Sequence, residues 1–353
     1  MLRRANLGSH SYKYLSLTCW GLRVIWSIQV LRFFAALMIV YIHAAETAMR
    51  ATGSFGSIPV ELGNIGHSGV DIFFVTSGFI IAKIAPGRSA SEFIWLRLRR
   101  IFPMYLVFTV PAVATAVAIT GFGWRDALAT FLLWPATDQM TAPVLGVGWT
   151  LCFEMLFYAC AALVLIDRRW AVAIIGAYGL AFLLRPAGPI FQFLGNPIIL
   201  EFLLGVAISS APSWRPGIWG IAIGAILLAA AGFFGVAPTD ETMDLLLGHE
   251  GLKRILVFGI PAAMIVYGTL QVKARESVWT YLGDASYSLY LSHTLPLSLL
   301  LAVWMKVAIP PDLIIAIGIS AALLFNWRIY ERIEKPIMAA LRRQPLLHGK
   351  VST

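Results

Sequence analysis

Apolar segments recur along the whole chain, and most are long enough to cross the hydrocarbon core of a membrane. A transmembrane helix needs about 20 predominantly apolar residues. Such segments lie near residues 28–46, 69–85, 101–120, 147–166, 170–185, 196–211, 217–235, 255–272, 286–305 and 313–330. Only 13% of the 353 residues are charged, against about a quarter in soluble domains. The sequence therefore predicts an all-α, polytopic membrane helical bundle with about ten transmembrane helices.

The distribution of basic residues predicts the orientation of this bundle. With a cytoplasmic N-terminus, one of the 27 Lys and Arg residues lies within a span, six lie outside, and the rest are cytoplasmic. The six are Arg50, Arg125, Arg185, Lys253, Arg254 and Lys306. Cytoplasmic loops of membrane proteins carry an excess of Lys and Arg. We therefore interpret the net charge of +9 as a topology signal, expect no nucleic-acid partner, and place both termini in the cytoplasm.

The chain is expected to form one membrane domain at residues 27–340. Residues 1–26 are interpreted as a poorly ordered N-terminal extension, because their apolar run is interrupted by polar residues and no signal-peptide cleavage site follows. Residues 341–353 are expected to be a cytoplasmic tail. The three cysteines form no CxxC pair or Cys/His cluster, so no metal site is predicted.

Arg32 and His43 stand eleven residues apart within the first apolar segment. On a helix, this spacing places both side chains on one face, about 20° apart in angle and roughly 16 Å apart along the axis. A charged residue inside a membrane is costly and usually faces the interior of the bundle. We therefore expect both groups to face a protein cavity, with His43 as the candidate catalytic residue.

Two acidic residues are predicted near the level of His43, because their spans run inward from the outer side. Asp71 begins the second span and could orient the His43 imidazole, although a simple acid at a helix start is equally compatible. Glu154, in the fourth span, is harder to explain as packing alone. We assign both to the candidate catalytic group with His43.

Three further groups of polar residues interrupt the apolar pattern. Ser77 and Gly78 fit either close helix packing or a slot for a ligand. Arg97 and Arg100 fit either a cytoplasmic anchor or a phosphate clamp. The ninth span, interrupted by a proline, carries Tyr287, Tyr290 and His293, which we place on a path for an acceptor substrate. Near the end of the chain, the acidic and basic residues 331–335 are expected to form a solvated turn at the inner surface.

Five motifs in order give the chain a family resemblance. They are SIQVLRFFAALMIVYIHA at 27–44, GVDIFFVTSGF at 69–79, RLRRIFPMY at 97–105, GWTLCFEMLFY at 148–158 and GDASYSLYLSH at 283–293. This arrangement resembles the acyltransferase-3 family of integral membrane acyltransferases, especially the branch that modifies bacterial exopolysaccharides.

The resemblance implies transfer of an acyl group, usually acetyl, from cytosolic acyl-CoA to a carbohydrate hydroxyl. Arg32 and His43 would then form the family's Arg-x10-His motif, and the donor would be handled by residues of three motifs. These are Arg32, Phe73, Phe74, Ser77, Gly78, Arg97 and Arg100. His43 would act as the general base or through an acyl-imidazole.

The resemblance also implies a location in the bacterial cytoplasmic (inner) membrane, in contact with lipid. The expected partners are acyl-CoA, as a donor substrate without a permanently bound cofactor, and a polysaccharide or lipid-linked oligosaccharide acceptor. The sequence does not specify the oligomeric state. Two alternatives remain: a transporter or flippase with a proton relay through intramembrane ionisable groups, and a non-catalytic subunit of a polysaccharide export complex.

Overall fold

The computed structural model describes residues 15–17, 23–211, 217–238 and 240–343. Most of this part of the chain is helical, which confirms the predicted all-α membrane class. Two antiparallel three-residue strands, β1 (Leu15–Leu17) and β2 (Arg23–Ile25), pair ahead of the first helix. The remainder of the predicted extension before residue 23, and residues 344–353 of the predicted tail, lie outside the described residues.

Seven helical stretches of the described chain are long and apolar enough to cross a membrane. They comprise α1 (Trp26–Thr52); α2 (Val60–Gly63), η1 (Asn64–Ser68) and α3 (Gly69–Ile84); α4 (Ala90–Ile119); η2 (Gly146–Gly148) and α6 (Trp149–Ile166); α8 (Pro189–Leu194) and α9 (Ile199–Ser210); α12 (Gly251–Arg254), the π-helix η4 (Ile255–Gly259) and α13 (Ile260–Thr269); and α17 (Pro311–Ile329), the π-helix η5 (Tyr330–Glu334) and α18 (Lys335–Arg343).

The other helices are shorter. Two of them, α7 (Trp170–Leu183) and α10 (Ile218–Phe233), are apolar and correspond to two of the expected spans. The remainder are α5 (Trp124–Phe131), η3 (Arg185–Ala187), α11 (Thr242–Leu247), α14 (Val278–Asp284), α15 (Ser286–Ser292) and α16 (Thr294–Trp304).

The ninth expected span is divided into two helices, α15 and α16, which meet at His293. Pro296 lies in the first turn of α16. Proline has no amide hydrogen to donate to the preceding turn, so it is tolerated where a new helix begins. The interruption places the His293 side chain at the junction, fully buried in the bundle.

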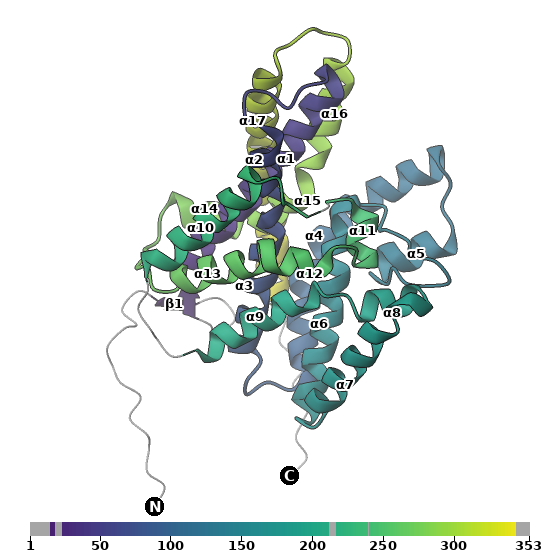
Figure 1. Ribbon diagram of the computed structural model, residues 1–353, viewed down its shortest axis with the longest axis vertical. Coiled ribbons are helices and arrows are strands. Elements are labelled where there is room, and N and C mark those ends of the chain that lie inside the picture. Colours follow the sequence, from purple (N-terminus) through teal and green to yellow (C-terminus); the bar gives the residue numbers. More distant parts are fainter. Residues whose placement is uncertain (1–14, 18–22, 212–216, 239, 344–353) are drawn as a thin grey trace, which may run out of the picture.

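Helix α1 is central to the arrangement. It contacts α3, α14, α16 and α17, and its upper part rises beside α16 and α17 in Figure 1. Helices α3 and α9 pack closely through glycines on both sides. A Cβ added at Gly78 would lie 2.0 Å from the carbonyl oxygen of Phe202, and one at Gly205 would lie 2.0 Å from that of Val75. Gly78 therefore serves close helix packing, the first of the two alternatives predicted for it.

A buried ion pair connects α3 to α12. Arg254 binds both carboxylate oxygens of Asp71, at 3.0 Å from Nε and 2.7 Å from Nη2, and both side chains are almost inaccessible to solvent. Arg254, which the charge pattern places on the outer side, is buried at the N-terminal end of a candidate span. The partner that the structure gives to Asp71 is this guanidinium rather than the His43 imidazole.

Candidate active site

A cavity of about 730 Å³ lies between α1, α3, α4, α6, α15 and the η5–α18 segment. Its volume is within the range of about 300–1,000 Å³ typical of small-molecule sites. The basic side chains on its wall outnumber the acidic ones. The basic residues are Arg32, Lys83, Arg88, Arg97, Arg100 and Lys335, and the acidic residues are Glu154, Asp284 and Glu334.

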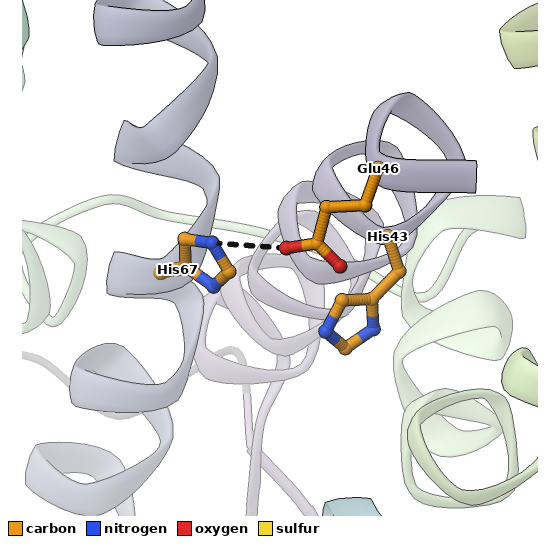
Figure 2. Close-up of side chains that lie close together, drawn as sticks. All are labelled: His43, Glu46 and His67. Atoms are coloured by element: carbon orange, nitrogen blue, oxygen red, sulfur yellow. Dashed lines mark ion pairs between the residues drawn. The ribbon is translucent and has the colours of Figure 1, made fainter. Parts of the chain in front are cut away.

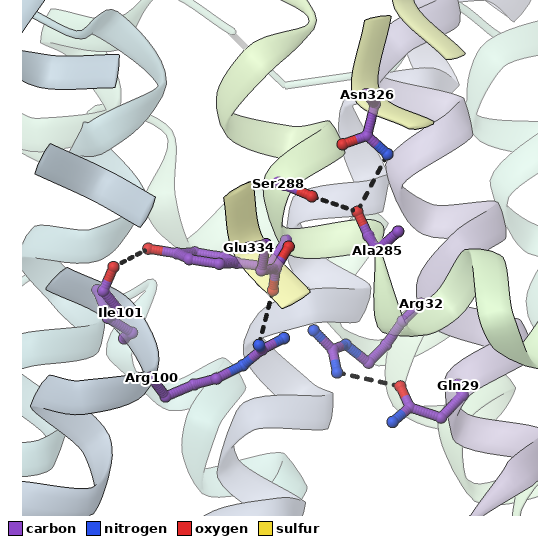
Figure 3. Close-up of polar contacts among 9 residues, drawn as sticks. Gln29, Arg32, Arg100, Ile101, Ala285, Ser288, Asn326 and Glu334 are labelled. Carbon is purple, nitrogen blue, oxygen red and sulfur yellow. Dashed lines mark hydrogen bonds and ion pairs between the residues drawn. The ribbon is translucent and has the colours of Figure 1, made fainter. Parts of the chain in front are cut away.

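Two arginines from different helices point into this space. Arg32 Nη1 donates a 3.1 Å hydrogen bond to Gln29 Oε1, and Arg100 Nη1 donates a 2.8 Å hydrogen bond to Glu334 Oε1. Figure 3 shows their guanidinium groups turned toward one another. Because like charges repel, an anion between the two groups would be favourable.

Glu334 is the residue that completes this arrangement, and the prediction of a solvated turn was wrong for it. Its side chain is only 1% exposed, because the π-helix η5 directs it inward to Arg100. A π-helical turn shifts the helix face by one residue, which periodicity along the sequence cannot reveal.

Arg97 belongs to a second polar network on the cavity wall. Its Nη2 lies 2.6 Å from the Tyr158 hydroxyl and 4.0 Å from Glu154. Glu154 accepts hydrogen bonds from Tyr158 and, at 2.9 Å, from Ser77. Sequence reasoning placed Glu154 near His43, whereas the structure places it in the polar network with Arg97.

The predicted aromatic residues are on the same wall. Phe73 and Phe74 both line the cavity, and Phe74 also packs against the Phe202 ring at 4.7 Å between centroids. Tyr287 donates to the Ile101 carbonyl oxygen at 2.9 Å, and the Arg100 guanidinium lies over its ring. Tyr287 thus lies beside the arginine cluster.

The side chains of His43 and His293 are hydrogen-bonded to each other, although the two residues are 250 positions apart. The distance from His43 Nδ1 to His293 Nε2 is 2.7 Å, and the rings are stacked with 9° between their planes. His293 Nδ1 lies 3.1 Å from the Leu289 carbonyl oxygen, which can only accept a hydrogen bond. For neutral rings, His293 therefore carries its hydrogen on Nδ1 and accepts from His43 Nδ1. This leaves the lone pair of His43 on Nε2.

Tyr290 connects the cavity to this histidine pair. It lines the cavity, and its ring centroid lies 6.1 Å from that of His293. Its hydroxyl is held by the Val147 carbonyl oxygen at 2.8 Å and the Thr150 hydroxyl at 3.0 Å. The cavity thus extends from the arginine cluster to the residue that adjoins His293. Neither histidine lines it, so of the two residues expected to face a cavity only Arg32 does.

A further cluster adjoins His43 and was missed from the sequence. Near the His43 ring, the Glu46 and Asp240 carboxylates both approach His67, and Figure 2 shows Glu46 and His67. Pairing with His67 lowers the pKa of the Asp240 carboxyl below its ordinary value. Glu46 could have been identified, because residues three apart share a helix face. His67 and Asp240 come from other segments and gave no such signal.

These groups can perform proton transfer to and from a substrate near His43, beside a cavity with an anion-attracting wall. A model of an acyltransferase domain, the acyltransferase-3 family, matches residues 25–331 of the chain. The chain belongs to this acyltransferase family.

Sequence alignments with curated relatives extend over most of the acyltransferase. It is 32% identical to the exopolysaccharide production protein ExoZ of Rhizobium meliloti, over 81% of this chain and 93% of that protein. It is 27% identical to the acyltransferase MdmB of Streptomyces mycarofaciens, over 76% of this chain and 77% of the relative. Nodulation protein 10 of Rhizobium leguminosarum is 24% identical, over 88% of this chain and 93% of that protein. No solved structure matches the chain significantly.

Proposed function

We propose that this membrane acyltransferase transfers an acyl group, in the simplest case acetyl, from cytosolic acyl-CoA to a hydroxyl of an exopolysaccharide or its lipid-linked precursor. The observation that carries the proposal is the cavity that extends from the arginine cluster to the residue beside the His43–His293 pair. The name of the ExoZ relative supports an exopolysaccharide acceptor. Family membership favours this enzyme class over the transporter and the export subunit.

The donor would bind with its phosphates at the arginine end. Arg32 and Arg100 face each other there, and arginine matches phosphate in charge and geometry. The pantetheine arm would follow the wall past Ser77 and Phe73 toward Tyr290. The thioester would then lie beside Tyr290, next to the His43–His293 pair.

His43 would act as the general base. Its Nε2 takes the proton from the acceptor hydroxyl while the hydroxyl oxygen attacks the thioester carbonyl carbon. The tetrahedral intermediate then collapses, the carbon–sulfur bond breaks, and His43 Nε2 returns the proton to the CoA sulfur. His293 accepts the hydrogen bond from His43 Nδ1 and so holds the lone pair on Nε2. Such proton transfer contributes typically 10²–10⁴-fold to a rate.

The substitution His43→Ala tests the proposal. In membranes supplied with labelled acetyl-CoA and purified polysaccharide, we expect label in the polymer with the unchanged protein and at least about 100-fold less with the variant. His249→Ala is the matched control, because His249 is exposed and pairs only locally with Asp244. Near-normal transfer by His43→Ala, at equal abundance, would exclude His43 as the base.

The acceptor can be identified independently. Mass spectrometry of the surface polysaccharide from a deletion strain should show loss of one ester substituent, whose mass gives the acyl chain. Movement of polysaccharide across the membrane without formation of an ester would instead support the transporter alternative.

A further inference from the structure

The cluster beside His43 contains donors of the kind that bind a divalent transition metal. Glu46 follows His43 by one helical turn on α1, His67 lies on η1, and Asp240 precedes α11. One ligand atom each from His43, Glu46 and His67 lie within 4.8 Å of one another. Figure 2 shows the His43 ring beneath the Glu46 carboxylate, with one ring nitrogen turned toward His67.

One of the two distances around His67, that to Glu46, suits a tetrahedral site. Its Nε2 lies 3.4 Å from Glu46 Oε1 and 2.8 Å from Asp240 Oδ2. Ligand atoms about 2.0–2.1 Å from a tetrahedral zinc ion are about 3.4 Å apart. His67 Nε2 is buried and lies close to both carboxylates, so a bound ion would replace these ion pairs. Imidazole and carboxylate ligands are those that Zn²⁺ accepts.

The cluster is accessible from one side. The Asp240 side chain is 45% exposed and that of Glu46 is 28% exposed, whereas His67 is 14% exposed. An ion could therefore enter past Asp240 and reach His67 and His43. The His43–His293 hydrogen bond uses Nδ1 of His43, so the Nε2 lone pair remains available to a metal.

We propose that His43, Glu46, His67 and Asp240 bind Zn²⁺, and that the bound ion inhibits acyl transfer by occupying Nε2 of His43. The inhibitory part rests on the proposed function, whereas the binding part does not. A metal coordinated to Nε2 takes the lone pair that would accept the hydroxyl proton. Removal of the ion by a chelator would restore the base.

Binding is tested first, without any assay of activity. Metal-free protein in nanodiscs is titrated with Zn²⁺ against a fluorescent chelator. We expect one site per chain, with affinity reduced at least tenfold by Glu46→Gln, His67→Asn or Asp240→Asn. His249→Asn is the control, since His249 and Asp244 form a separate exposed pair. Absence of a Zn²⁺ site, or an equal loss of Zn²⁺ affinity in the His249→Asn control, would overturn the proposal.

Inhibition is tested second, with each variant compared to its own rate without metal. Zn²⁺ should inhibit the unchanged protein reversibly, and Glu46→Gln should raise the half-inhibitory concentration at least tenfold. Site-dependent binding that leaves transfer unaffected, or stimulates it, would overturn the inhibitory role. Site-dependent binding in a protein that transfers no acyl group would contradict the proposed function and still support the metal site.

Discussion

At the scale of single residues, the proposed chemistry depends on pairs that are distant in sequence. Periodicity placed Arg32 and His43 on one face of a helix, and the structure has both on α1. It could not reveal that His293 would be the partner of His43, because that contact depends on how α15 packs against α1. For the same reason, Asp71 was expected beside His43, whereas its bonds go to Arg254.

The His43–His293 bond predicts an effect on the rate of chemistry. His293→Leu removes the acceptor for His43 Nδ1, so the lone pair is no longer held on Nε2. We expect kcat to fall about 100-fold or more, with the KM for acetyl-CoA unchanged. Steady-state kinetics of protein in nanodiscs would measure both constants.

The conservative variant His293→Gln controls for a purely structural role. The glutamine Oε1 can accept the hydrogen bond, so part of the rate should return, with a changed pH profile. An equal loss of kcat in both variants, or a rise in KM alone, would argue that His293 only supports the packing.

The arginine cluster predicts an effect on donor binding. Arg100→Gln alone would leave Glu334 buried without its partner, so the double variant Arg100→Gln, Glu334→Gln removes both charges together. Hydrogen bonds to charged groups contribute about 1.5–3 kcal/mol, and we therefore expect the KM for acetyl-CoA to rise about tenfold to a hundredfold. Glu334→Gln is the control for the loss of the acid. An unchanged KM in the double variant would favour the anchor interpretation.

At the scale of helices, hydrophobicity located the apolar spans. The expected spans correspond to the seven long apolar stretches, the two shorter apolar helices and the interrupted pair α15–α16. The inward direction of Glu334 was not foreseeable, because it depends on the π-helical turn η5. Nor could the sequence decide whether Gly78 met a ligand or another helix, since Phe202 approaches it from α9.

Close packing of α3 on α9 predicts that Gly78→Ala is destabilising. The added Cβ would lie 2.0 Å from a backbone carbonyl oxygen, so the helices must separate. Overpacking costs about 1–3 kcal/mol, so we expect a lower melting temperature in detergent. The melting temperature is measured by size-exclusion chromatography of samples heated to increasing temperatures. Gly176→Ala is the matched control, because an added Cβ there meets nothing within 4 Å. Equal melting temperatures for the two variants would contradict this account of Gly78.

At the scale of the whole molecule, the mechanism requires a particular orientation. Arg88, Arg97 and Lys335 lie along the cavity, while Glu46, His67 and Asp240 lie beside His43 in a separate cluster. Cytosolic acyl-CoA can reach the arginines only if they face the cytoplasm. The excess of Lys and Arg predicts this orientation. Under the proposed function, the donor would then bind on the inner side and the acceptor on the outer side.

Cysteine labelling tests this orientation directly. In a background without native cysteines, Ser54→Cys and Ser91→Cys place exposed thiols in the loop after α1 and at the start of α4, respectively. A membrane-impermeant maleimide should label Ser54→Cys in intact spheroplasts, and Ser91→Cys only after permeabilisation. Labelling of Ser91→Cys after permeabilisation also controls for its accessibility. The reverse pattern would place the arginines outside, where cytosolic acyl-CoA could not reach them, and would remove the basis for the donor assignment.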